Sequence, residues 1–151
     1  DAYEAKKSQK FLNEQYSIFG TQNENSEHSV TIMHLDVDDI TSIRKKSMSP
    51  YDTSSLMFKI YSRMSEYFLS KNSLTFFMGG DNFMVVTNSE FKNFAKDFIQ
   101  ICKDEFQIEL NCGIGTASTS RNAVKLATQS LDTIREIRDA GKEKPEIYEL
   151  N

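Results

Sequence analysis

Short apolar runs alternate along the chain with longer segments whose apolar residues recur every three or four positions. This pattern predicts strands at 30–35, in a hairpin over 74–87, at 107–116 and, at an edge, at 147–150. It predicts helices from about 52 to 69, from 89 to 106 and from 119 to 141. The resulting order, β-α-β-β-α-β-α, is typical of a split βαβ sheet in which the first strand and the hairpin can lie side by side.

The first 29 residues differ from the rest. Residues 1–19 are helix-like but have only a patchy apolar face, Gly20 is a stop signal, and residues 21–29 are polar. We therefore expect a helix and a linker ahead of the main domain. The helix is either docked on that domain or the tail of a preceding unit.

The hairpin is the segment around which the other predictions are organised. Two runs of aromatic and β-branched residues flank a four-residue turn, Gly79-Gly80-Asp81-Asn82. The glycines supply backbone freedom and leave room for a ligand close to the main chain. Asp81 and Asn82 put an acceptor and an amide at the tip. On this segment alone, a plain turn and a ligand-binding tip are both open interpretations.

The first strand runs into three carboxylates within four residues, Asp36, Asp38 and Asp39. Such a cluster is costly unless a cation or hydrogen-bond donors lie among the acids. Because side chains alternate along a strand, His34, Asp36 and Asp38 are expected on one face. Asp38 or Asp39 is expected to cap a following helical turn. That cap does not account for all three carboxylates. Asp36 and Asp81 can then converge at one edge of the sheet, as hard oxygen ligands of Mg²⁺ carried by a nucleoside triphosphate.

Composition excludes several classes of protein. An apolar fraction of 38% with 11 Phe indicates a globular chain, and the net charge of −4 gives no global reason to expect nucleic-acid binding. The Phe-rich helix over 89–106 is interpreted as core, not as a platform for stacked bases. No apolar run approaches the length of a membrane span and no signal peptide is visible, so a cytoplasmic protein without membrane contact is expected. Cys102 and Cys112 lack the spacing of a disulfide framework or zinc site, and are interpreted as small core residues.

The motifs together resemble the palm-type nucleotidyl cyclase and polymerase superfamily, which includes the GGDEF diguanylate cyclases. Within it, the chain most resembles archaeal GTP cyclohydrolase III, over most of its length. The resemblance is carried by five groups of residues. They are His34-Leu35-Asp36-Val37-Asp38-Asp39-Ile40-Thr41, Tyr51-Asp52-Thr53, Phe76-Phe77-Met78-Gly79-Gly80-Asp81-Asn82-Phe83-Met84, Ile108-Glu109-Leu110 with Gly113-Ile114-Gly115, and Leu126-Ala127 with Ile134-Arg135.

The resemblance implies an α+β, ferredoxin-like palm, with an antiparallel-rich sheet and helices packed on one face. That family resembles two tandem palm repeats, and these motifs are similar to its C-terminal half. Residues 1–29 are then expected to be the trailing helix of an upstream repeat plus a linker, and residues 30–151 the palm-like catalytic domain. By this interpretation the chain is a piece of a longer enzyme, with reduced or no activity alone.

The resemblance also implies a reaction: a Mg²⁺-dependent hydrolase that opens the imidazole ring of GTP, keeps the formyl group and releases pyrophosphate. The product would be a formylaminopyrimidine ribotide monophosphate, a precursor in cofactor biosynthesis. Implied with it are Mg²⁺, a monovalent cation as a second ion, GTP as the partner molecule, and a homo-oligomer.

Matched residue by residue, the resemblance implies catalytic roles for Asp36, Asp81 and His34. The metal ligands would be the carboxylates of Asp36 and Asp81 and the carbonyl of Val37. His34 would serve as acid or base at the purine, and a His packed in the sheet is an equal alternative. The nucleotide-binding set would be Gly79, Gly80, Asn82, Phe77 and Arg135, with Arg135 facing the phosphates.

One position departs from the superfamily pattern. Asn82 stands where diguanylate cyclases carry a metal-binding acid. This difference weakens a cyclase interpretation and leaves fewer negative charges to bind a metal. Two alternatives stay open: a palm-type cyclase or oligonucleotide synthase, and a non-catalytic nucleotide-binding module.

Overall fold

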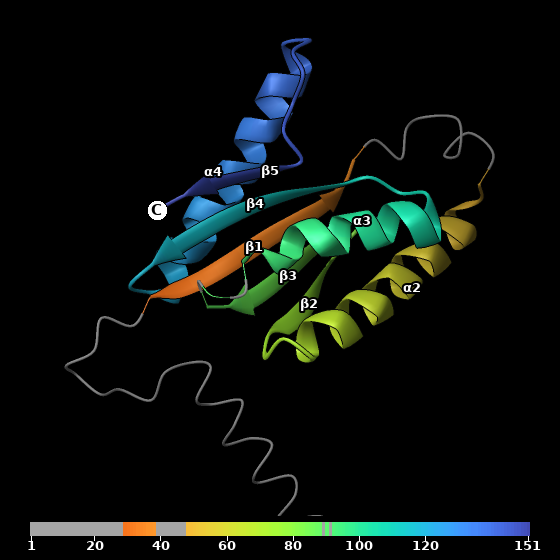
Figure 1. Ribbon diagram of the computed structural model, residues 1–151. Helices are drawn as coiled ribbons and strands as arrows, with labels where there is room; N and C mark the ends of the chain where they lie inside the picture. Colours follow the sequence, from red (N-terminus) through yellow and green to blue (C-terminus); the bar gives the residue numbers. More distant parts are fainter. Residues whose placement is uncertain (1–28, 39–47, 89, 91) are drawn as a thin grey trace, which may run out of the picture.

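The computed structural model describes residues 29–38, 48–88, 90 and 92–151 (Figure 1). The helix and linker expected before residue 29 and the helical turn expected after Asp38 lie outside these residues. In chain order the elements are β1 (Val30–Val37), α2 (Pro50–Leu69), β2 (Leu74–Gly79), β3 (Asn82–Thr87), α3 (Phe94–Phe106), β4 (Leu110–Ala117), α4 (Ser120–Asp139) and β5 (Ile147–Leu150).

The strands form one sheet in the order β2-β3-β1-β4-β5. Strand β1 is central and antiparallel to both β3 and β4, and β5 pairs with β4 in parallel. The predicted order of elements is therefore confirmed, as are the neighbouring positions of the first strand and the hairpin. The expected edge strand at 147–150 is confirmed as well.

The predicted α+β palm is confirmed, but the expectation that all helices pack on one face is wrong. Met33, Leu35 and Val37 of β1 are buried in a cluster with α2 and α3, whereas Ile32 is buried with Ala123 and other residues of α4. Both faces of β1 carry buried residues, so both need cover, and α4 lies across the sheet from α2 and α3 (Figure 1).

Close packing of α4 depends on two glycines in β4. A Cβ added at Gly113 would lie 2.2 Å from the carbonyl oxygen of Ala127, and one added at Gly115 would lie 2.3 Å from that of Ala123. Both distances are shorter than any real contact, so only glycine lets the helix backbone approach this strand. The two glycines thereby fix how near α4 comes to the polar residues of β1.

Several predicted boundaries are corrected by local chemistry. Helix α2 begins earlier than expected, because Ser49 and Asp52 form a reciprocal capping box and Pro50 occupies the first turn. Helix α3 begins later, at Phe94. Strand β4 also begins later, since Gln107 adopts a left-handed conformation with φ +52° as the C-cap of α3.

Two negative expectations can be compared with the described part of the chain. Cys102 and Cys112 are both buried and free, so the interpretation as small core residues is confirmed. Among the described residues, none of the helices has both the length and the apolar character needed to cross a membrane.

Candidate functional site

The end of β1 and the tip of the hairpin meet at one edge of the sheet. Asp36 lies opposite Asn82 in the β1–β3 register, and the amide of Val37 donates to the carbonyl oxygen of Asp81 at 3.3 Å. The predicted convergence of Asp36 and Asp81 is therefore confirmed at the level of the main chain. The hairpin loop is tighter than expected, because Gly79 pairs with Asn82 and only two residues lie between the strands.

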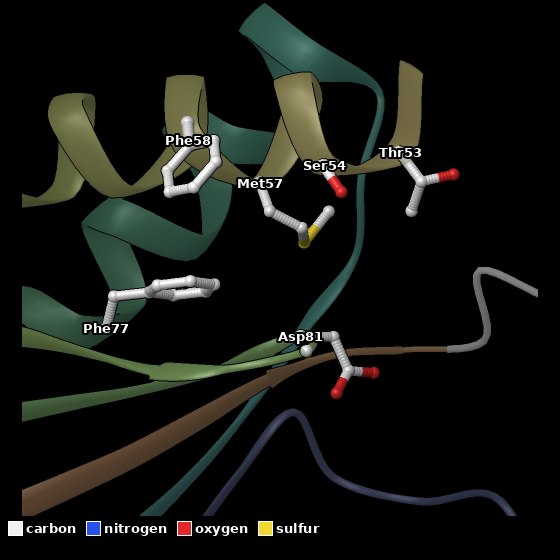
Figure 2. Close-up of a pocket in the computed structure, with 7 residues that line it drawn as sticks. Thr53, Ser54, Met57, Phe58, Phe77 and Asp81 are labelled. Atoms are coloured by element: carbon white, nitrogen blue, oxygen red, sulfur yellow. The ribbon is translucent and has the colours of Figure 1, made fainter. Parts of the chain in front are cut away.

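A cavity of about 490 Å³ opens between α2 and this hairpin (Figure 2). Its size lies within the usual range for small-molecule sites. The helix contributes two hydroxyls and two apolar side chains, and the hairpin contributes a ring and the loop; the lining residues are Thr53, Ser54, Met57, Phe58, Phe77, Gly80 and Asp81. The rings of Phe58 and Phe77 lie 5.5 Å apart between centroids. The cavity therefore combines an aromatic wall with polar groups at its rim.

Two of the four turn residues, Gly79 and Gly80, carry no side chain. Gly79 and Gly80 have φ of +96° and +61°, a conformation that favours glycine. Among the described residues, a Cβ added at Gly79 would have no atom within 4 Å, and one at Gly80 would reach only the Asn82 amide at 4.0 Å. The predicted freedom of both glycines is confirmed, and the backbone of the tip is open to an approaching molecule.

Asp81 lies at the boundary between the cavity and the α4 side of the sheet. It lines the cavity, yet its carboxylate points away from α2 (Figure 2). Its Oδ1 accepts a hydrogen bond from the Asn82 amide at 2.8 Å. Of the residues predicted to bind nucleotide or metal, Phe77 and Gly80 share the cavity with Asp81, whereas the remaining polar side chains belong to the α4 side.

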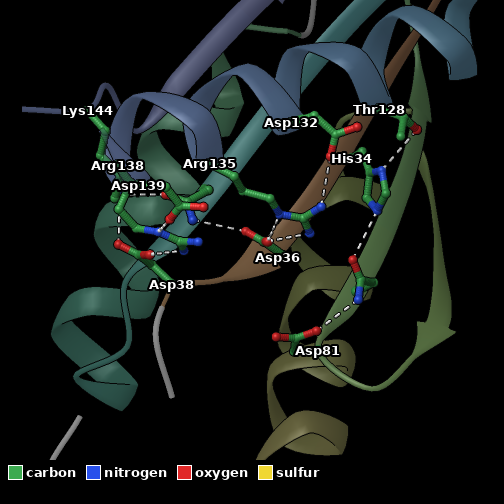
Figure 3. A network of polar contacts seen from close by, with 12 residues as sticks. His34, Asp36, Asp38, Asp81, Thr128, Asp132, Arg135, Arg138, Asp139 and Lys144 are labelled. Carbon is green, nitrogen blue, oxygen red and sulfur yellow. Dashed lines mark hydrogen bonds and ion pairs between the residues drawn. The ribbon is translucent and has the colours of Figure 1, made fainter. Parts of the chain in front are cut away.

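On the α4 side, Asp36 is almost fully buried, with 5% of its surface exposed, and its carboxylate is held by two residues (Figure 3). Arg135 of α4 donates to Oδ2 at 2.7 Å and 3.0 Å, and the Asn111 amide donates to Oδ1 at 3.0 Å. Arg135 also donates to Oδ1 of Asp132 at 3.0 Å. Burial opposes the charge of Arg135, but the hydrogen bonds and charges of Asp36 and Asp132 outweigh it and raise the pKa of the guanidinium. The predicted cation is thus next to the predicted metal ligand.

Asp38 is held by a second set of cations. Lys144 lies 2.7 Å from its Oδ2 and Arg138 lies 3.5 Å from its Oδ1. Burial alone would raise the pKa of Asp38, but the hydrogen bond from Lys144 and the charges of Lys144 and Arg138 outweigh burial and lower it. Lys144 also donates to Asn111 Oδ1 at 2.6 Å. The expectation that His34, Asp36 and Asp38 share one face is confirmed, since all three contact residues of α4 or the segment after it.

His34 has partners at both ring nitrogens. Nδ1 lies 3.2 Å from Oγ1 of Thr128 on α4, and Nε2 lies 3.2 Å from Oδ1 of Asn82. Burial lowers the pKa of His34, and the hydrogen bond with Asn82 only partly opposes this. The ring therefore lies between the sheet and α4, across the sheet from the cavity. Its role as an acid or base stays a prediction.

Sequence reasoning missed the part of the cavity wall that α2 contributes and several members of the polar network. The sequence singles out Thr53 only as part of a motif. Phe58 falls outside the buried stripe of α2, and its 58% exposure marks it as an aromatic side chain without a core role. Asn111 and Lys144 carry no local signal, because their contacts depend on strand register and on the return of the chain after α4.

The fold is shared with solved structures of GGDEF domains and nucleotidyl cyclases. A GGDEF domain from Pseudomonas aeruginosa superposes with a TM-score of 0.63 at 18% identity, covering 92% of this chain and 91% of that one. The catalytic core of a rhodopsin-guanylyl cyclase in complex with ATPαS gives a TM-score of 0.56 at 20% identity, covering 70% and 72%. At these identities the likeness shows the fold alone.

Sequence comparison is more specific. The GTP cyclohydrolase III of Methanocaldococcus jannaschii is 36% identical over 106 residues, which are 70% of this chain and 40% of that protein. The GTP cyclohydrolase III of Methanococcus maripaludis is 38% identical over 122 residues, 80% of this chain and 44% of that protein. The chain thus spans less than half the length of these relatives. The family model for GTP cyclohydrolase III matches residues 2–146, and the chain therefore belongs to the GTP cyclohydrolase III family.

Proposed function

We propose that this chain contributes the nucleotide site of a Mg²⁺-dependent GTP hydrolase that opens the guanine imidazole ring. The reaction would release pyrophosphate and give a formylaminopyrimidine ribotide monophosphate. The observation that carries the proposal is the cavity beside the bare hairpin tip, which has Asp81 in its wall and the end of β1 next to it. Membership of the GTP cyclohydrolase III family supplies the substrate and the reaction class.

The purine base would occupy the cavity. Phe58 and Phe77 offer ring faces, and an aromatic face is a favourable surface for a flat heterocycle. The hydroxyls of Thr53 and Ser54 line the same cavity and can donate to or accept from the polar edge of a guanine. The combination of an apolar wall with a few polar groups is what fixes the orientation of a small ligand.

The phosphates would pass over the hairpin tip toward the α4 side. Gly79 and Gly80 leave this path open, because no side chain rises from either residue. Beyond the tip lie the Asp81 carboxylate, Asp36 and the guanidinium of Arg135. A guanidinium beside Asp36 can neutralise a phosphate oxygen and hold it in a fixed direction. Asn82 lies on the same route as a further polar contact.

The donors at this edge fit Mg²⁺ that arrives with a triphosphate. Among the described residues no group of three or more His, Cys, Asp and Glu side chains forms a ready cage for a metal. Mg²⁺ at phosphate sites is commonly bound by one or two carboxylates together with the phosphates. A carboxylate has roughly four acceptor positions. Hydrogen bonds from the described residues occupy three on Asp36 and one on Asp81, so both carboxylates can accept a metal as well.

Asp36, Asp81 and the Val37 carbonyl are accordingly the proposed ligands. When bound there, Mg²⁺ would neutralise the triphosphate and polarise the phosphorus toward water. The residues themselves would orient the nucleotide: the cavity fixes the base, and the carboxylates with Arg135 fix the phosphates. His34 lies across the sheet from the cavity, and its role as an acid or base stays a prediction.

The decisive experiment incubates the purified protein with GTP and MgCl₂ and identifies products by mass spectrometry. A formylaminopyrimidine ribotide monophosphate with pyrophosphate is expected. A phosphodiester-linked product would instead assign a palm-type cyclase or synthase, and GTP binding without turnover would assign a non-catalytic module. Repeating the assay with potassium replaced by a bulky organic cation tests the expected second ion.

Variants connect the activity to the site. Asp81→Asn and Asp36→Asn are each expected to abolish Mg²⁺-dependent turnover while the circular dichroism spectrum stays that of the wild type. Asp104→Asn is the matched control, because Asp104 is exposed on α3 and bonds to Gln100 of the same helix. Wild-type rates in either site variant would remove that carboxylate from the proposed ligand set.

We also propose that the protein self-associates. Phe76 and Met78 on the edge strand β2 are 44% and 56% exposed, and two apolar side chains on a strand with an open edge suit pairing with a second copy. Light scattering is expected to give a mass above that of one chain, and Phe76→Ser with Met78→Ser is expected to lower it. A monomeric wild-type protein would contradict this proposal.

A further inference from the structure

Three hydrogen bonds connect helix α4 to the carboxylate at the hairpin tip (Figure 3). Oγ1 of Thr128 lies 3.2 Å from Nδ1 of His34, Nε2 of His34 lies 3.2 Å from Oδ1 of Asn82, and Nδ2 of Asn82 donates to Oδ1 of Asp81 at 2.8 Å. The connected residues come from α4, β1, β3 and the hairpin loop. The chain of contacts thus runs from the helix, past the central strand, to the edge of the cavity.

The direction of each hydrogen bond follows from donor and acceptor chemistry. An ionised carboxylate only accepts, so the Asn82 amide nitrogen must face Asp81 and the Asn82 oxygen must face His34. That oxygen is an acceptor, so Nε2 of His34 carries the ring proton. In a neutral imidazole Nδ1 is then the acceptor, and the Thr128 hydroxyl donates to it. Each group in this series of hydrogen bonds is therefore assigned as a donor or an acceptor.

The fold itself places Thr128 against the ring. His34 lies opposite Gly113 in the β1–β4 register. The missing side chain of Gly113 is what admits the α4 backbone at Ala127, the residue before Thr128. A bulkier residue in β4 would move the helix away and break the first contact. The close approach of α4 thus allows Thr128 to orient the imidazole ring of His34.

We infer that His34 is a positioning residue that acts through Asn82 on the Asp81 carboxylate, with Thr128 selecting the ring tautomer. Asn82 accordingly serves as the connecting amide, because its oxygen and its nitrogen both have protein partners. The effect on catalysis rests on the proposed function, in which Asp81 is a metal ligand. Loss of a group that orients a metal ligand typically weakens metal affinity roughly 10- to 100-fold.

The first test is spectroscopic and needs no turnover. The chain has two histidines, so a His28→Gln variant identifies the signals of His34 in long-range ¹H–¹⁵N correlation spectra. The wild type is expected to show the Nε2–H tautomer. Thr128→Val is expected to move the Nδ1 resonance, and Thr128→Ser to restore it. Thr133→Val is the matched control, because the Thr133 hydroxyl donates to the carbonyl of Gln129 in the same helix.

The second test is functional. His34→Leu removes both ring nitrogens and is expected to raise the Mg²⁺ concentration for half-maximal GTP turnover about tenfold or more. His34→Gln retains an amide that can donate to Asn82 and is expected to recover most of that loss, which a merely structural role for His34 would not predict. His34→Leu is also expected to move the Asn82 side-chain amide resonances. Thr128→Val serves as the milder variant if His34→Leu does not fold.

The inference is overturned if the wild-type ring is the Nδ1–H tautomer, if Thr128→Val leaves Nδ1 unchanged, or if His34→Leu leaves the Asn82 amide resonances in place. It is equally overturned if His34→Leu keeps wild-type Mg²⁺ dependence. A wild-type protein without GTP turnover would contradict the proposed function, while the resonance shifts would still decide the inference about His34.

Discussion

Nε and Nη2 of Arg135 donate to the same oxygen of Asp36, at 3.0 Å and 2.7 Å. Asp36 is buried, so its charge depends on this guanidinium and on the Asn111 amide. Removing the cation by Arg135→Met is expected to lower the free energy of unfolding by about 1–3 kcal/mol, the range for a buried polar group that loses its partner. Urea titration followed by circular dichroism measures the change.

Two further variants separate charge from geometry. Arg135→Lys keeps the charge but cannot donate from two nitrogens, so an intermediate loss is expected. Arg121→Met removes an exposed arginine of the same helix and should stay within about 0.5 kcal/mol of the wild type. Equal stability of Arg121→Met and Arg135→Met would show that the ion pair with Asp36 does not support the fold.

The parts of the fold that were predicted correctly have local signals. The hairpin is marked by two apolar runs around a glycine-rich turn, and the face of α4 is marked by the spacing of Ala127, Leu131 and Ile134, all fully buried. The convergence of Asp36 and Asp81 followed because the order of elements leaves few ways to pair the strands.

The placement of helices on both faces was not predicted, because a strand buried on two sides reads as a continuous apolar run. Ile32 and Met33 are adjacent in sequence and are buried by different helices. The residues around them give no signal of this difference. The polar network was missed for a related reason. Asn111 reaches Asp36 only in the register that places them opposite each other, and register is a property of the assembled sheet.

Gly113 provides a prediction about packing. Gly113→Ala would put a methyl group 2.2 Å from the Ala127 carbonyl oxygen and 2.4 Å from the Leu131 amide, both backbone atoms that cannot rotate away. We expect a loss of about 3 kcal/mol in the free energy of unfolding, the upper part of the usual range for overpacking. Ser118→Ala, an exposed position just after β4, is the control. Thermal denaturation of the two variants would detect the difference, and an unchanged midpoint for Gly113→Ala would contradict the close packing of α4.

The cysteines provide a prediction about reactivity. Burial raises the pKa of Cys102 to about 12 and that of Cys112 further, and the thiolate is the reactive form. At pH 8 roughly one Cys102 thiol in ten thousand would be ionised. The folded protein is therefore expected to resist iodoacetamide for hours, whereas both residues should be alkylated within minutes in guanidinium chloride. Rapid labelling of the folded protein, read by mass spectrometry, would show that one of these side chains is accessible.

Phe58 tests whether the cavity holds the base. Its side chain is 58% exposed, so Phe58→Ala should change the midpoint of thermal denaturation very little. If the ring contacts a purine, its loss should raise KM for GTP about tenfold with a smaller change in kcat, since an aromatic contact is worth up to ~1.5 kcal/mol. Leu69→Ala is the matched control, because Leu69 lies on the same helix and is also exposed, at 47%, but is not among the described residues that line the cavity. Equal KM values for the two variants would place the base elsewhere, whereas a rise confined to Phe58→Ala would assign the cavity between α2 and the hairpin to the nucleobase.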